Sequence, residues 1–258
     1  MPLIDADGCP LWVESAGPER APVLMLSNSL GTNLQMWDAQ IAPFSKHFRV
    51  LRYDRRGHGK SGVTPGPYTM ERLARDALAI LDALGIARVH WCGLSMGGME
   101  GMWLGANAPG RIGRLILSNT SAYYADKSLW NDRIQAIRAN GLAPLADRVL
   151  GLWCTPEFRT RAPQDVARLA AMLTATPVEG YLGCCEAIRD MDHRDLLPRI
   201  AAPTLVIAGR QDQATPPAAA ELIKERVPGA SLAILDAAHI SNVEQPTQYT
   251  DTVLRFLA

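Results

Sequence analysis

Long hydrophobic runs are missing from this sequence of 258 residues, although 48% of them are hydrophobic. No apolar run reaches the ~18 residues that a helix needs to cross a bilayer. The N-terminal segment MPLIDADGCP has neither the basic nor the apolar part of a secretion signal. We therefore expect a cytoplasmic protein with no membrane partner and a large hydrophobic core.

An excess of charge of either sign is also missing. The 26 basic and 26 acidic residues cancel, and no basic block is available to neutralise a phosphate backbone. This balance argues against a nucleic-acid partner. A neutral chain of this length and composition is typical of one α/β domain with an insertion.

Cysteines are few, and their spacing excludes two common uses. The sequence has five, Cys9, Cys92, Cys154, Cys184 and Cys185, with no C-x-x-C pair. An odd number with two neighbours favours reduced and buried thiols, as in a cytoplasmic protein. No group of His, Cys and carboxylate residues has the spacing of metal ligands. We therefore expect neither a metal nor an organic cofactor.

What the sequence does contain is a regular alternation of short apolar segments with longer segments of helical periodicity. Candidate helices lie near 33–46, 69–84, 96–108, 216–227 and 246–257, and Thr215 is the expected cap of the fourth. The candidate strands are LWVES, PVLMLSNS, FRVLRYD, RVHWCGL, RLILSNT, PTLVIAG and SLAILDAA. Several are apolar at successive positions, as in strands buried on both faces of a parallel sheet. The alternation predicts an α/β fold with helices on both faces.

One region interrupts the alternation. From about residue 122 to residue 190 we find helical patterns and no convincing strand. An insertion of this length between two strands predicts a helical lid over one edge of the sheet. The expected organisation is a core formed by residues 1–121 and 191–258, with residues 122–190 as the lid.

The segment Gly93-Leu94-Ser95-Met96-Gly97 matches the pattern G-x-S-x-G between a predicted strand and a predicted helix. A sharp turn there strains the backbone of the central residue and exposes its side chain, while the glycines let neighbouring backbone pass. Free N–H groups at the start of the helix can face a developing oxyanion. The pattern therefore makes Ser95 the candidate nucleophile. The alternative is a glycine-rich turn with an incidental serine.

A serine hydroxyl needs a base, which in this architecture comes late in the chain and after an acid. Of the five histidines, only His239 follows the next acid at a strand end, Asp212. A carboxylate there can fix the tautomer of His239 and stabilise the imidazolium. Asp236 competes for this role but lies on the same strand end as His239. Some proteins of this architecture carry the acid one strand earlier, where this sequence has Asn119.

The triad motifs, together with SNSLGTN at 27–33 and YDRRGHGKSG at 53–62, resemble the α/β-hydrolase family across essentially the whole chain. The resemblance implies the α/β-hydrolase fold, with a mostly parallel eight-stranded sheet. In finer detail, LSNSLGT, GLSMGGM and AHISNVEQP resemble 3-oxoadipate enol-lactonases. That implies a cofactor-free hydrolase that opens the enol-lactone of 3-oxoadipate in aromatic-acid catabolism. The family's oxyanion donors fall on the backbone N–H groups of Leu30 and Met96.

A substrate carboxylate needs a cation, and arginine can bind it through two parallel hydrogen bonds. Trp130, Arg133 and Arg138 lie at the start of the insertion, and we expect at least one of the two arginines to face the cleft with Trp130 over the substrate ring.

A generalist carboxylesterase with perhydrolase activity, like the haloperoxidase-like esterases that share these motifs, is the first alternative function. A slow ligand sensor is the second.

Gly59-Lys60-Ser61 imitates the end of a phosphate-binding loop. That pattern requires a glycine five positions before Gly59, and the sequence has Asp54 there. The segment is therefore expected to be a structural loop beside the site. We expect Arg55 and Arg56 in the same loop to pair with Asp54 or with a neighbouring acid.

Overall fold

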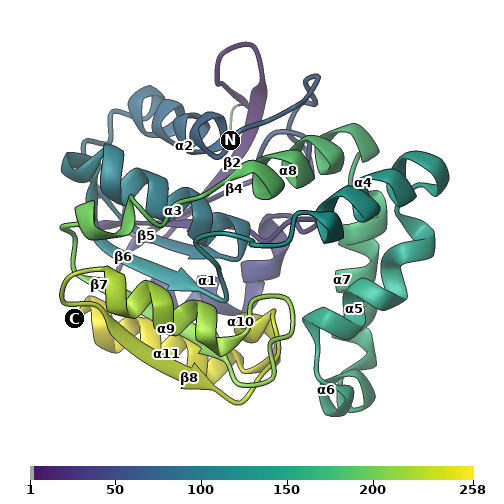
Figure 1. Ribbon diagram of the computed structural model, residues 1–258. Helices are drawn as coiled ribbons and strands as arrows, with labels where there is room; N and C mark the ends of the chain where they lie inside the picture. Colours follow the sequence, from purple (N-terminus) through teal and green to yellow (C-terminus); the bar gives the residue numbers. More distant parts are fainter. Residues whose placement is uncertain (1–2) are drawn as a thin grey trace.

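Eight strands form one sheet in the computed structural model, which describes residues 3–258 (Figure 1). The sheet has the order β1-β2-β4-β3-β5-β6-β7-β8. Strands β1 and β2 pair antiparallel, as do β2 and β4, and every later pair is parallel. The strands are β1 (Leu3–Asp5), β2 (Pro10–Ala16), β3 (Val23–Ser27), β4 (Arg49–Tyr53), β5 (Val89–Leu94), β6 (Ile112–Ser118), β7 (Thr204–Gly209) and β8 (Ser231–Leu235). The prediction of a mostly parallel eight-stranded sheet is confirmed.

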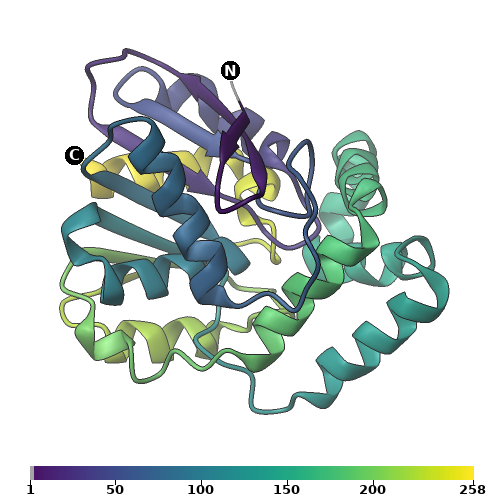
Figure 2. The same cartoon turned by 90° about the horizontal axis from the view of Figure 1, so that it is seen from above.

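Helices cover both faces of the sheet, and this explains the continuous apolar sequence of the central strands. Strand β7 is buried at every position. Helices α2 (Met70–Ala83), α3 (Met96–Asn107) and α9 (Pro217–Arg226) cover one face, and α1 (Asp38–Phe44) packs with α11 (Pro246–Leu257) on the other (Figures 1 and 2). Because neither face meets water, the strands need no alternation of polar and apolar residues.

Three local expectations differ from the structure, and one short helix was not predicted. Strand β1 is absent from the predicted strands, because three residues are too few to show a pattern. The helix expected over 33–46 is divided into a 3₁₀ turn and α1. Thr215 does not cap α9, because Pro216 occupies the N-cap position and no side chain caps the helix; the Thr215 hydroxyl donates to Asp212 instead. The loop after His239 contains the short helix α10 (Ser241–Glu244).

Five helices lie between β6 and β7, in the segment where the sequence lost its alternation. They are α4 (Ser128–Asn140), α5 (Ala146–Trp153), α6 (Pro156–Arg161), α7 (Pro163–Ala175) and α8 (Val178–Asp190). We call residues 122–190 the cap. Most of the cap lies beside the sheet, on the right in Figure 1, and an antiparallel bridge between Tyr123 and Asp192 joins its two connections to the core.

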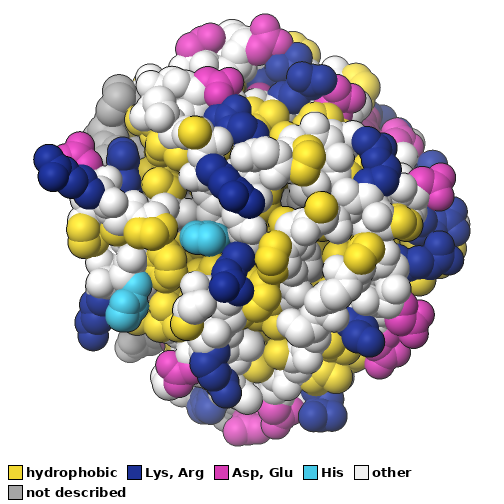
Figure 3. Space-filling model, turned by 90° about the vertical axis from the view of Figure 1, so that its left-hand side faces the viewer, with side chains coloured by type: hydrophobic (Ala, Val, Ile, Leu, Met, Phe, Trp, Pro, Cys, Tyr) yellow, Lys and Arg dark blue, Asp and Glu magenta, His cyan; other side chains and the backbone are white. Residues whose placement is uncertain are grey.

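The surface opposite the cap carries basic, acidic and apolar side chains intermixed (Figure 3).

All five cysteines are free and buried, and burial raises the pKa of the Cys92 thiol to about 12. Across residues 3–258, no helix combines the length and apolar character needed to cross a membrane. The same residues contain no group of three His, Cys, Asp or Glu side chains placed to hold a metal ion.

Candidate active site

Ser95 lies on a sharp turn between β5 and α3, with φ 56° and ψ −114°. This left-handed backbone is costly for a residue with a Cβ and occurs where the surrounding structure enforces it. The glycines around Ser95 allow a close approach of backbone. A Cβ on Gly93 would lie 2.0 Å from the Gly97 oxygen, and one on Gly97 would lie 2.3 Å from the Ser27 oxygen. The chain can therefore make this turn only with glycine at both positions.

His239 and Asp212 meet at the same edge of the sheet, with His239 Nδ1 2.9 Å from Asp212 Oδ2. Both side chains are buried. Because the carboxylate can only accept, Nδ1 carries the proton of this hydrogen bond, which in the neutral imidazole leaves Nε2 as the acceptor. Asp236, the competing acid, is exposed and accepts a hydrogen bond from Gln211 Nε2 instead. The geometry therefore favours Asp212 as the partner of His239.

The Asp212 carboxylate has donors on both oxygens. Its Oδ1 accepts the backbone N–H groups of Ala214 and Thr215, both at 2.9 Å, and its Oδ2 accepts the Thr215 hydroxyl at 2.7 Å. Burial alone would raise the pKa of Asp212, but the facing His239 ring and these donors outweigh it, so the pKa lies below its ordinary value. The carboxylate stays ionised beside the imidazole.

Asn119 is a site residue that sequence reasoning rejected as an acid and otherwise missed. Its Nδ2 donates to Asp212 Oδ2 at 3.0 Å and to the Ala238 carbonyl at 3.1 Å. Its Oδ1 accepts from Ser241 Oγ at 2.6 Å. The side chain therefore joins the acid to both sides of the loop that carries His239. Its place at the end of β6 was the available signal.

Leu30 and Met96 each have a backbone N–H that donates to no protein group of residues 3–258. Their neighbours in the chain are paired: Ser29 with Met36 Sδ, Gly31 with His58 Nε2, Ser95 with the Ser118 oxygen, and Gly97 with the Asn28 oxygen. The two free N–H groups therefore fall at the two positions that the family resemblance implies.

A cavity of about 430 Å³ brings the expected residues together. Ser95, His239 and Leu30 line it from the core, and Trp130 and Arg133 line it from the cap. Within residues 3–258, no hydrogen bond joins Ser95 Oγ to His239 Nε2. Such catalytic contacts often shorten only when substrate binds. The volume is within the range of small-molecule sites.

The two arginines expected at the cleft lie differently. The Arg133 guanidinium lies 4.8 Å from the centre of the Trp130 ring, and both residues line the cavity. Arg138 is not among the described residues that line it. Its exposed guanidinium pairs with Glu186 Oε1 at 2.9 Å, so its assignment to substrate binding is corrected. Arg148 also lines the cavity. Nothing in its spacing distinguished it from other surface arginines.

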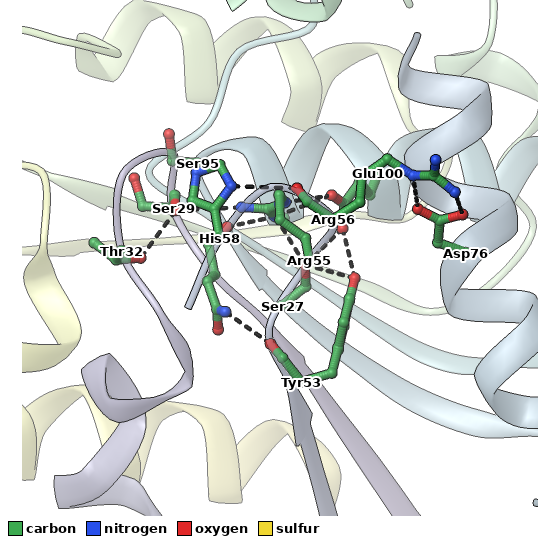
Figure 4. Close-up of polar contacts among 12 residues, drawn as sticks. Ser27, Ser29, Thr32, Tyr53, Arg55, Arg56, His58, Asp76, Ser95 and Glu100 are labelled. Atoms are coloured by element: carbon green, nitrogen blue, oxygen red, sulfur yellow. Dashed lines mark hydrogen bonds and ion pairs between the residues drawn. The ribbon is translucent and has the colours of Figure 1, made fainter. Parts of the chain in front are cut away.

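The loop after β4, which carries Arg55, Arg56 and His58, lies beside Ser95 (Figure 4). Arg55 pairs with Glu100 at 2.9 Å and Arg56 with Asp76 at 2.5 Å, all four side chains being buried. Neither arginine pairs with Asp54, which accepts backbone N–H groups. The sequence left open whether these arginines pair with Asp54 or with a neighbouring acid. In the structure both pair with neighbouring acids.

These features lie together at one edge of a mostly parallel sheet covered by helices. Residues 22–246 match the family model of the alpha/beta hydrolase fold, and the chain belongs to this family of hydrolases. It is 43% identical to 3-oxoadipate enol-lactonase 2 of Acinetobacter baylyi over 92% of this chain and 89% of the relative. It is 37% identical to 3-oxoadipate enol-lactonase 1 of the same organism, over 96% of this chain and 92% of the relative.

A solved structure gives the same similarity in three dimensions. The crystal structure of the enol-lactonase from Burkholderia xenovorans superposes with a TM-score of 0.96. The identity is 44%, and 98% of each chain is covered. The fold, cap included, is therefore shared with an enol-lactonase along nearly its whole length.

Proposed function

We propose that the protein hydrolyses the enol-lactone of 3-oxoadipate to 3-oxoadipate in the catabolism of aromatic acids. The observation that carries this proposal is the cavity in which Ser95 and His239 lie with a cationic side chain, Arg133. The names of the A. baylyi relatives supply the substrate. Residues 122–190 serve as the lid over this cavity, and the reaction uses no metal or organic cofactor.

In the first half of the reaction, Ser95 attacks the lactone carbonyl while His239 Nε2 removes its proton. The negative charge that develops on the carbonyl oxygen is held by the N–H groups of Leu30 and Met96. The ring bond then breaks, and the enol oxygen takes the proton from His239. The leaving group stays attached to the acyl-enzyme, because it was part of the same ring.

In the second half, water attacks the acyl-enzyme with His239 as base, and Ser95 recovers its proton. The released enol tautomerises to the ketone, which gives 3-oxoadipate. Asp212 keeps the Nδ1 proton in place and stabilises the imidazolium in both halves. The four N–H and hydroxyl donors around Asp212, outside His239, keep it ionised.

The substrate also carries a carboxylate, which loses hydration on entering the cavity and needs a partner there. Arg133 provides it, since its guanidinium lies 4.8 Å from the centre of the Trp130 ring and the two residues line the cavity together. The charge preference separates this function from that of a generalist carboxylesterase, which would need no cation. A slow ligand sensor would bind the lactone without steady turnover.

The test compares turnover of the acidic lactone with that of a neutral nitrophenyl ester. Ser95→Ala should lower kcat for both by about 10⁴-fold or more, since the nucleophile acts as a unit with its base. Arg133→Met should raise KM for the lactone by roughly tenfold or more, the worth of a charge-assisted hydrogen bond, and leave the ester unchanged. Steady-state assays of both substrates measure the two effects.

Arg138→Met is the matched control, because it removes an arginine of the same helix that pairs with Glu186 away from the cavity. It should leave both substrates unaffected. Equal losses on both substrates in Arg133→Met would favour the generalist esterase, and lactone binding without steady-state turnover by the wild type would favour the sensor. Full kcat in Ser95→Ala would exclude the mechanism.

A further inference from the structure

The pair formed by Arg55 and Glu100 lies beside Ser29 and Ser95 (Figure 4), the residues that precede Leu30 and Met96 in the chain. Glu100 is on α3, the helix that begins beside Ser95, and Arg55 is on the loop after β4. Both are buried, with relative exposures of 1% and 0%. Glu100 Oε1 accepts from Arg55 Nε at 3.0 Å, while Oε2 accepts from Tyr53 and Ser27 hydroxyls. The carboxylate is thus fully paired.

The Nη groups of Arg55 reach the end of β3, where Nη2 donates to Ser27 Oγ at 3.2 Å, and the β3 loop, residues 28–32. Its Nη2 donates to the Asn28 oxygen at 2.8 Å and its Nη1 to the Ser29 oxygen at 3.2 Å. The Thr32 hydroxyl donates to the same Ser29 oxygen at 2.9 Å. A planar guanidinium with its Nε on Glu100 therefore fixes two successive carbonyl groups of this loop.

The Ser29 carbonyl belongs to the same peptide unit as the Leu30 N–H. In a planar trans peptide the C=O and N–H bonds point in opposite directions. Because Arg55 and Thr32 hold the carbonyl on the protein side, the N–H is directed away from them, and Ser29 and Leu30 both line the cavity. The next peptide is also fixed, since Gly31 N–H donates to His58 Nε2 at 3.1 Å.

We propose that Arg55 is a positioning residue that sets the oxyanion hole, by orienting the Ser29–Leu30 peptide and tying the β3 loop to the nucleophile helix through Glu100. The inference rests on the proposed function, in which Leu30 N–H stabilises the oxyanion. Arg55 does not touch substrate. Its effect is on the transition state, because the oxyanion is present there and absent from the bound ester.

The pair of Arg56 and Asp76 provides an internal comparison. It is similarly buried, and it comes from the next residue of the same loop. The guanidinium of Arg56 donates to Thr64 and to the Ala6 oxygen, which are not among the residues lining the cavity. Loss of either pair removes one buried ion pair, but only the first loss frees the β3 loop.

The experiment replaces each pair by neutral side chains of similar shape, Arg55→Met with Glu100→Gln and Arg56→Met with Asp76→Asn. Removing both partners avoids leaving an unpaired buried charge. With the neutral nitrophenyl ester, the first double variant should lose roughly 100-fold in kcat with little change in KM, the effect of losing one oxyanion donor. Its affinity for a boronic acid that forms a tetrahedral adduct with Ser95 should fall by a similar factor.

The second double variant should lower the Tm comparably while its kcat stays within about threefold of the wild type. Equal kcat losses in both double variants, or a rise in KM alone, would overturn the proposal. If the first double variant does not fold, Arg55→Lys decides. Lysine keeps the charge but lacks the planar fork, so kcat should fall about tenfold, and wild-type kcat would overturn the proposal.

Ser95→Ala in the same assay separates the two claims. Turnover of the ester by Ser95→Ala at the wild-type rate would refute the proposed function itself. Loss of turnover in Ser95→Ala together with wild-type kcat in the Arg55 variants would refute only the role of Arg55.

Discussion

At the residue scale, Asn119 has an unusual backbone and an unusual number of partners. It has a positive φ of 46°, and its side chain bonds to Asp212, Ala238 and Ser241. A non-glycine residue pays for this conformation, and it is retained where the surrounding contacts require it. Here the contacts fix Asp212 and the loop that carries His239 relative to each other. Asn119 therefore positions both of them without carrying charge.

Asn119→Gly should lower kcat roughly tenfold, because the bond to the ionised Asp212 is lost while glycine accepts the backbone conformation without strain. Kinetics on the neutral ester measure the loss of kcat, and chemical denaturation measures whether the free energy of unfolding is retained. Asp7→Gly is the control, since Asp7 is exposed and also has a positive φ, of 54°. An equal fall of kcat in Asp7→Gly, or none in Asn119→Gly, would contradict the role.

At the element scale, cap helix α8 lies against the loop after β4 with no space between the two backbones. A Cβ on Gly180 would lie 2.3 Å from the Gly57 Cα, and Gly57 itself has a positive φ of 74°. The same helix contributes Tyr181 and Ile188 to the cavity. The position of α8 therefore determines both the fit of the cap on the core and one wall of the cavity.

Gly180→Ala should destabilise the protein by about 2 kcal/mol, because the methyl group meets backbone that cannot rotate away. Gly151→Ala in α5 is the control, since its nearest atom would be Arg159 Nη1 at 3.7 Å. That change should be neutral or stabilising by up to ~1 kcal/mol from helix propensity. Urea denaturation distinguishes the two variants. Similar free energies of unfolding would show that the contact of α8 with the loop does not constrain the fold.

At the scale of the whole molecule, two buried histidines are neutral in the folded protein. Burial lowers the pKa of His193 to about 4, and burial together with the nearby charge of Arg55 lowers that of His58 to about 3. An unfolded histidine titrates near 6.5. Between these values the unfolded chain binds more protons than the folded one, so acid favours unfolding. The stability from neutral histidines is complete above pH 6.5 and declines below it.

The free energy of unfolding should therefore decrease as the pH falls from 7 to 4, with about 3 kcal/mol of the decrease from His193. His193→Gln should remove that part of the pH dependence. His47→Gln, a change of an exposed histidine, should not. Denaturation at a series of pH values measures the slope in each protein. The same slope in wild type and His193→Gln would show that His193 is protonated in the folded state.

The order of motifs along the chain was enough to predict the parallel sheet, the helical insertion, and that Ser95, Asp212 and His239 lie at the same edge of the sheet. The reason is that consecutive parallel strands end at the same edge of a sheet, so residues at those ends meet whatever the details of packing. A tight turn can also be predicted from the local sequence, because it requires glycine. The prediction of the sharp turn around Ser95 depended on no contact between residues distant in sequence.

Only the tertiary structure decided which arginines face the cavity, and how the backbone donors are held. Arg133 and Arg138 are on one helix, and the pairing of Arg138 with Glu186 depends on how α4 packs against α8. Arg55 and Glu100 are 45 residues apart, and their pairing has no sequence period. A backbone N–H is present at every residue except proline, so only a folded chain shows which ones remain free. Local sequence records turns and strand ends, while contacts between distant side chains depend on the packing of the whole molecule.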